Sequence, residues 1–192
     1  MATSVSLMQI AQPGHLDPSA GFEEPFEMLS ACHERVERML RLMVRLQEHL
    51  QDKGWDEQVR QAASDVMRYF DMAAPLHHED EERHVFPPLM LSADAQVKAL
   101  VLRLIQDHRQ MEVAWQGAST VLTAVAKHDA SNPFEALTVS QKVALNDFAR
   151  LYRKHLDDEN QVAYPAARHW LTPSDLTAMG EDMMARRGVK PK

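Results

Sequence analysis

Apolar side chains recur every three or four residues along four long stretches of the chain, which is the spacing of one face of an α-helix. These stretches cover residues 24–51, 56–86, 92–127 and 134–164. Gly54 follows the first stretch and Pro87-Pro88 closes the second, as is typical of helix ends. Ser92 is a candidate N-cap for the third stretch. With short connections between them, these helices predict an all-α, up-down-up-down antiparallel four-helix bundle.

The two ends of the chain differ from the helical stretches in composition. Residues 1–21 mix Pro, Gly, Ser and Asp without a period, so we expect a flexible N-terminal arm before a bundle at residues 22–170. Residues 171–192 begin with a Thr-Pro-Ser-Asp segment and predict a short C-terminal helix and tail. Inside the second stretch, Pro75 removes one backbone hydrogen bond and predicts a kink just before His77.

Composition argues against several classes of protein. The 192 residues suit one domain, and the presence of only six glycines among many helix formers agrees with an all-α fold. The net charge of −7 without a basic stripe argues against nucleic acid or an anionic membrane as a partner. Cys32 is the only cysteine, which excludes a disulfide framework and a thiolate metal cluster. The chain shows neither a signal-like start nor a transmembrane run, so we expect a soluble cytoplasmic protein.

Polar residues interrupt the apolar face of every predicted helix. Each face carries a histidine, and three of the faces carry a glutamate one turn later. A carboxylate buried without a partner costs several kcal/mol or becomes protonated. Three carboxylates at apolar positions therefore need a cation, and we expect metal ligands among these residues. The candidate ligands are His33, His77, Glu81, His108, Glu112, His155 and Glu159.

The spacing His-x-x-x-Glu places both side chains on one helix face, where they can reach the same metal ion or bridge a pair. It occurs five times, more often than ten histidines would produce by chance. The segment HHEDEERHVFP at residues 77–87 also aligns without gaps on HLDDENQVAYP at residues 155–165. The alignment matches the His, Asp, Glu and final aromatic-proline positions. It therefore singles out His77 and Glu81 as the repeated pair.

The sequence resembles the hemerythrin-like family, also called the HHE cation-binding domain, over about residues 24–168. The resemblance rests on one histidine in the first helix and His-x-x-x-Glu with a closing Phe-Pro in the second. It continues with His108 in the third helix and His-x-x-x-Glu in the fourth. This family is an up-down four-helix bundle that holds a non-haem di-iron centre. Typical members carry a second histidine on the third helix where this chain has Glu112, so the pattern departs there.

The resemblance implies two non-haem iron ions with an oxo or hydroxo bridge, and manganese as an alternative at one or both positions. Imidazole and carboxylate donors suit either metal, and the lack of thiolates argues against a structural zinc site. If Glu112 is a ligand, about one coordination position stays open for O₂, NO or peroxide. The added carboxylate charge would also stabilise the oxidised centre, which predicts a poor reversible oxygen carrier.

Polar and aromatic residues beside the candidate ligands have other expected roles. His78, Glu82 and His84 have no counterpart in the repeat, so we expect them at the surface or in contact with ligands rather than on the metal. Trp115, one turn beyond Glu112, either walls the open coordination position or packs in the core.

Two functions remain open from the sequence. The first is a di-iron protein that binds a small diatomic or peroxide ligand, in sensing or in the oxidative or nitrosative stress response. The second is an iron-handling protein, for storage or delivery, that does not activate a diatomic. An oxidoreductase of the ferritin-like carboxylate type is disfavoured because its signature is Glu-x-x-His. The sequence does not decide whether the protein is an enzyme or which oligomer it forms.

Overall fold

The computed structural model describes residues 21–189, so the expectations for residues 1–20 and 190–192 lie outside this range. The described residues are helical, without a strand, and the predicted all-α class is confirmed. Two short elements, η1 and η2, are π-helical turns. In chain order the elements are α2 (Pro25–Asp52), α3 (Glu57–Asp80), η1 (Glu81–Val85), α4 (Phe86–Met90), α5 (Ala95–Ala126), α6 (Val139–Asp158), η2 (Glu159–Ala163), α7 (Tyr164–Trp170) and α8 (Pro173–Arg186).

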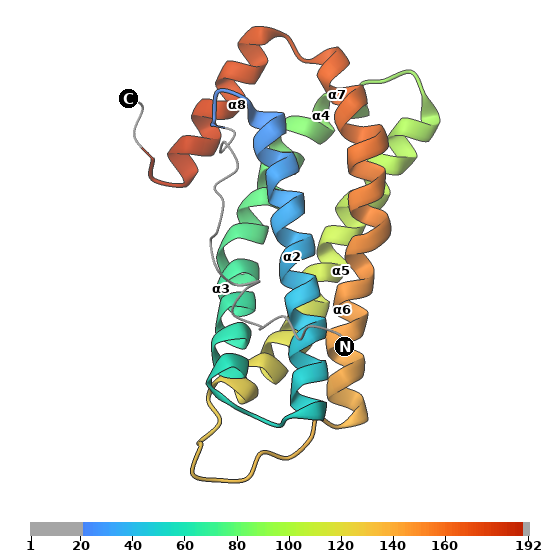
Figure 1. The fold of residues 1–192 in the computed structure, drawn as a ribbon. Coiled ribbons are helices and arrows are strands. Elements are labelled where there is room, and N and C mark those ends of the chain that lie inside the picture. Colours follow the sequence, from blue (N-terminus) through green and yellow to red (C-terminus); the bar gives the residue numbers. More distant parts are fainter. Residues whose placement is uncertain (1–20, 190–192) are drawn as a thin grey trace, which may run out of the picture.

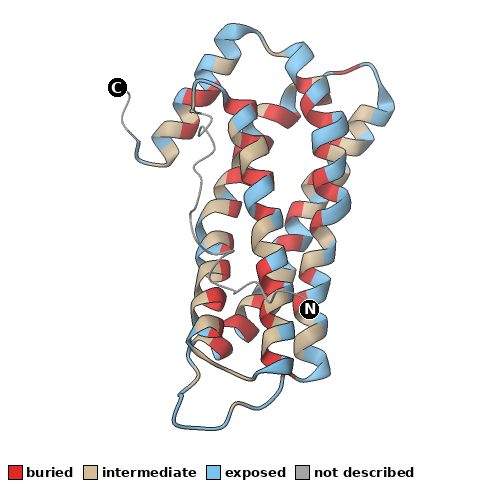
Figure 2. Ribbon diagram, viewed as in Figure 1, coloured by how far each residue is buried: buried red, intermediate tan, exposed pale blue. Residues whose placement is uncertain are grey.

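The long helices α2, α3, α5 and α6 lie side by side and form a helical bundle (Figure 1). The chain runs down α2, up α3, down α5 and up α6 in this view, and α4, α7 and α8 lie near the upper end. Buried residues gather on the faces that the long helices turn toward one another, with exposed residues on the outside (Figure 2). None of the helices in residues 21–189 combines the length and the apolar content that a membrane crossing requires.

Two helices begin later than the sequence predicts, because each starts at a side chain that can cap it. Asp94, rather than Ser92, caps α5, and its carboxylate accepts the backbone N–H of Gln96 at 2.7 Å. Thr138 and Gln141 form a reciprocal capping box at the start of α6. These side chains satisfy N–H groups that have no partner in the first helical turn, and they thereby fix the helix starts.

Two clusters of buried apolar residues fill the bundle, and the polar candidates lie between them. In α2, His33 lies between Leu29 of one cluster and Val36 of the other. In α5, His108 lies in the same way between members of the two clusters. The polar residues are therefore enclosed above and below by packed apolar side chains, where charges interact strongly and water is scarce.

Helix α8 lies where the sequence predicts a short C-terminal helix, and it is tied to α3 through the buried residue Asp80. The guanidinium of Arg187 donates to both carboxylate oxygens of Asp80, at 2.6 and 3.2 Å. Arg186 donates to the same carboxylate. Gly180 lets α8 approach closely, because a Cβ atom there would overlap the carbonyl oxygen of Phe22. Since Asp80 precedes Glu81, these contacts hold the end of α3 in place.

Replacing Asp80 by alanine should lower the free energy of unfolding by about 2–4 kcal/mol, because two arginines lose their buried partner. Urea denaturation of the metal-free protein measures this. Asp147→Ala is a matched control, since it removes only an exposed ion pair with Arg150 at 3.2 Å and should leave the midpoint unchanged. Equal midpoints for both variants would contradict a stabilising role for Asp80.

Candidate metal centre

The two copies of the repeated segment fold in the same way. His77 lies in the last turn of α3 and His155 in the last turn of α6, and the glutamate after each histidine begins a π-helical turn. The N–H groups of Phe86 and Tyr164 donate to the carbonyl of the glutamate five residues earlier. The proline after each aromatic residue has no N–H group with which to restore α-helical bonding. Such π turns are frequent at functional sites.

Six of the seven candidate ligands are buried together inside the bundle, each at most 3% exposed. They form two groups, and within each group the ligand atoms lie within 4.8 Å of one another. One group contains His33, His77, Glu81 and Glu159, and the other contains His108, His155 and Glu159. Residues from α2, α3, α5 and α6, or from the turns that extend them, therefore meet at one place.

Glu159 lies between the two sides of this cluster. Its Oε2 atom is 3.3 Å from Nε2 of His33, and its Oε1 atom is 3.0 Å from Nε2 of His155. Nε2 of His108 is 3.8 Å from the same Oε1 atom. One carboxylate oxygen faces each side, which is the arrangement that a carboxylate needs to bridge two metal ions.

Glu81, the first residue of η1, repeats this arrangement. Its Oε1 atom is 3.5 Å from Nε2 of His77, and its Oε2 atom is 3.5 Å from Nε2 of His108. Five buried atoms of the cluster have no hydrogen-bond partner among the described residues: both ring nitrogens of His77, Oε2 of Glu81 and both carboxylate oxygens of Glu159. Buried polar atoms without partners are costly, and a cation would satisfy them. These imidazole and carboxylate donors fit iron or manganese.

Acceptors outside the cluster orient three of its histidines. In each case Nδ1 faces a side-chain oxygen, which favours a proton on Nδ1 and leaves Nε2 directed at the cluster. Histidines that bind metals typically donate their second nitrogen in this way. The pairs are His33 with Asn160 at 2.9 Å, His108 with Glu82 at 2.9 Å and His155 with Asp107 at 3.4 Å.

Comparison with known proteins identifies the family. The model of the hemerythrin HHE cation binding domain matches residues 24–167. The chain belongs to the hemerythrin HHE family. An uncharacterized protein of Haemophilus influenzae is 32% identical over 183 residues, which cover 95% of this chain and 99% of that protein. The match confirms the family that the sequence resembles, and cation binding agrees with the buried His and Glu groups.

Charge pairing in this hemerythrin HHE centre determines the protonation of the metal-free protein. Burial lowers the pKa of His33 and His108, but the carboxylates of Glu159 and Glu81 outweigh it and raise these pKa values to about 10 and about 11. The pKa of His155 is raised by the same balance. Burial raises the pKa of both carboxyl groups, but the histidines hold it below its ordinary value. In the metal-free centre His33 and His108 are therefore imidazolium ions beside two carboxylates, whereas His77, whose pKa burial lowers to about 4, is neutral.

Tyr164 is a member of the centre that sequence reasoning missed. Its hydroxyl lies 2.9 Å from Nε2 of His33 and donates to Oε1 of Glu81. Its ring stacks on that of His33, with centroids 5.1 Å apart. The repeat aligns Tyr164 with Phe86, so only one copy carries a hydroxyl. A polar aromatic residue at an otherwise apolar position was the signal that could have found it.

The structure corrects the expected place of Glu112. Its side chain is 57% exposed, and its carboxylate pairs with Arg109 at 2.6 Å rather than with a cluster histidine. Four residues advance a helix by about 400°, so Glu112 lies about 40° beyond His108 around α5, toward solvent. Met111 occupies the inward position instead. Glu112 therefore belongs to neither group of potential ligands in the described residues.

Three polar residues of the first repeated segment that are not candidate ligands lie in different surroundings. Glu82 accepts a hydrogen bond from His108, so it contacts a potential ligand. His78 is buried and stacks on the ring of His108, with centroids 3.9 Å apart and planes 10° from parallel. His84 pairs with Asp182 of α8 at 2.7 Å. Of the three, Glu82 and His78 adjoin the cluster directly.

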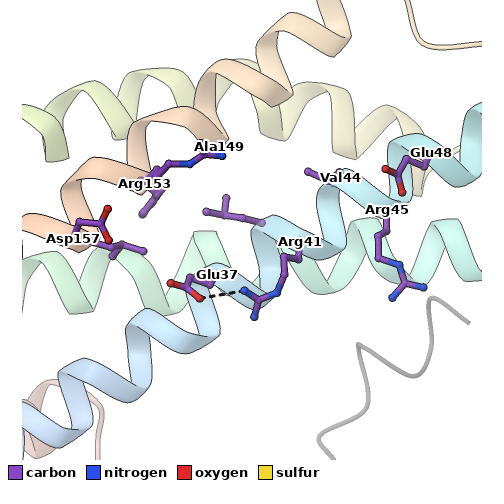
Figure 3. Close-up of a pocket in the computed structure, with 11 residues that line it drawn as sticks. Glu37, Arg41, Val44, Arg45, Glu48, Ala149, Arg153 and Asp157 are labelled. Atoms are coloured by element: carbon purple, nitrogen blue, oxygen red, sulfur yellow. Dashed lines mark hydrogen bonds and ion pairs between the residues drawn. The ribbon is translucent and has the colours of Figure 1, made fainter. Parts of the chain in front are cut away.

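A groove of about 600 Å³ lies between α2 and α6, outside the metal centre (Figure 3). None of the six buried candidate ligands lines it. Its rim is charged, and Glu37, which follows His33 at the repeated spacing, accepts from Arg41 there at 3.1 Å. Glu37 is thus a surface residue, and this groove is separate from the buried cluster.

Proposed function

We propose that this hemerythrin HHE protein holds two non-haem iron ions, with manganese as an alternative, and binds O₂, NO or peroxide there. The observation that carries the proposal is the placement of Glu81 and Glu159. Each presents one oxygen to the His33 and His77 side of the cluster and its other oxygen to the opposite side. One ion would not use two separate sets of histidines with two carboxylates between them.

The donor set assigns each residue a role. His33 and His77 would hold one ion, His108 and His155 the other, and the two carboxylates would span both. The bound metal supplies redox chemistry and an open position for a small ligand. Without Glu112 the ligand set leaves one more coordination position open on the metal ions. It also carries one negative charge less, so the charge argument against reversible oxygen binding no longer applies.

We assign this chemistry to sensing or to the oxidative or nitrosative stress response in the cytoplasm, within an up-down-up-down bundle of the hemerythrin type. The burial of all six donors supports this role over iron handling. A protein that delivers iron must expose ligands so that an acceptor can compete for them. Packed apolar clusters on both sides of the centre make such exchange slow.

Anaerobic reconstitution with ferrous salt tests the proposal. We expect two iron ions per chain, and absorption bands after oxidation that shift when azide or NO is added. Bound iron should resist removal by a moderate chelator for hours. Iron that leaves within minutes would favour handling, and a chain that takes up no iron or manganese would refute the proposal.

A further inference from the structure

A small cavity of about 50 Å³ opens between α3 and α5 and reaches inward to His78. Its walls are mainly apolar and include Phe70, Ala74, Met111 and Phe148. Apolar walls of this kind favour apolar guests. The volume suits one molecule little larger than water, whose share of the liquid is about 30 Å³. A diatomic gas therefore fits it, and larger metabolites do not.

One side chain separates this cavity from the potential metal ligands. His78 lines the cavity, and its ring lies flat on that of His108 at 3.9 Å. His108 belongs to the second group of potential ligands. The His78 ring therefore lies between the cavity and one potential metal ligand.

The mouth of the cavity is acidic. Glu112 lines it and is exposed, and Trp115, which also lines it, donates its indole N–H to Asp71 at 2.8 Å. Glu82 lies beside Glu112, because both pair with Arg109. Two carboxylates thus share one guanidinium beside the entrance, and the Asp71 carboxylate adds a further negative charge through its contact with Trp115. Such a field repels anions and leaves uncharged molecules unaffected.

We infer that this cavity is the entry site for a small uncharged ligand, O₂ or NO, with His78 as the movable partition before the metal centre. The inference rests on the proposed function where it names the metal centre as the place that the ligand reaches. The cavity itself can be tested without metal. The inference also gives Glu112 a role: the negative charge of this carboxylate at the mouth excludes anions such as azide from this route.

Xenon binding to the metal-free protein, followed by ¹²⁹Xe NMR, tests the cavity. Wild type should show saturable binding, and Ala74→Val should abolish it, since the added methyl groups fill the space. Ala73→Val changes the neighbouring residue of α3, which does not line the cavity, and should bind xenon as wild type does. Equal binding by both variants would overturn the inference, and so would its absence from wild type.

Stopped-flow mixing of the iron-loaded protein tests the route. Ala74→Val should slow NO association about tenfold and leave azide association and iron content unchanged. His78→Ala should accelerate NO association several-fold, with the iron content and the thermal unfolding midpoint close to those of wild type. NO rates equal to wild type in both variants would overturn the route. A chain that binds xenon as expected but no metal would refute the proposed function and leave the cavity as a binding site.

Discussion

Replacing Glu159 by alanine should abolish the loading of both metal ions, because among the described residues this carboxylate alone belongs to both groups of potential ligands. Its two oxygens face His33 on one side and His155 on the other. Loss of one partner from a buried charged cluster costs about 3–5 kcal/mol. At about 1.4 kcal/mol for each tenfold change, metal affinity should fall by about a hundredfold to several thousandfold. Iron content after reconstitution and gel filtration measures this directly.

Glu112→Ala is the matched control for this variant. It also removes a carboxylate, but one that is exposed and paired with Arg109, so the iron content should match that of wild type. Glu159→Gln keeps the volume of the side chain and should lose iron as the alanine variant does, which separates charge from packing. Full iron content in Glu159→Ala, or loss of iron in Glu112→Ala, would show that the proposed set of metal ligands is wrong.

Helical periodicity was sufficient to predict most of the fold and the inward direction of six polar side chains. His33 and His108 interrupt apolar stripes whose flanking residues are buried, so their direction follows from the 3.6-residue period. The repeated segment showed that His77 and His155 occupy equivalent positions, and the structure gives them equivalent turns. The same period fails at the margins of a stripe. Glu112 is one such marginal position, and it turns outward beside Arg109.

Other features depend on contacts between distant segments that no local pattern encodes. The hydroxyl of Tyr164 matters only because the fold brings it to His33, which lies 131 residues away in the sequence. Likewise, the partner of Asp80 is Arg187, at a separation of 107 residues. The π turns were missed for a different reason. Each inserts one extra residue into a helix, so the sequence beyond it still reads as helical although its phase has shifted.

Metal binding should release at least two protons per chain near neutral pH, because the metal must displace protons from His33 and His108, and His155, whose pKa is also raised, adds to this number. With pKa values of about 10 and about 11, both imidazoles are protonated at pH 7 in the metal-free protein. His77 contributes none, since burial lowers its pKa to about 4. The carboxyl groups contribute none either, because their pKa values lie below the ordinary value. Calorimetry in buffers of different ionisation enthalpy counts the released protons.

The pH trends of the two forms should run in opposite directions. In the metal-free protein the pKa values of His33 and His108 exceed the ordinary 6.5, so their stabilisation is complete below about pH 6.5 and is lost as pH rises through 10 to 11. Between pH 6.5 and about 9 the combined metal association constant should instead rise by at least about 100-fold per pH unit, because the protons displaced from His33 and His108 contribute about tenfold each. Thermal unfolding of both forms across this range measures the divergence. Parallel trends would mean that neither imidazole loses a proton when metal binds, and that the metal is bound elsewhere.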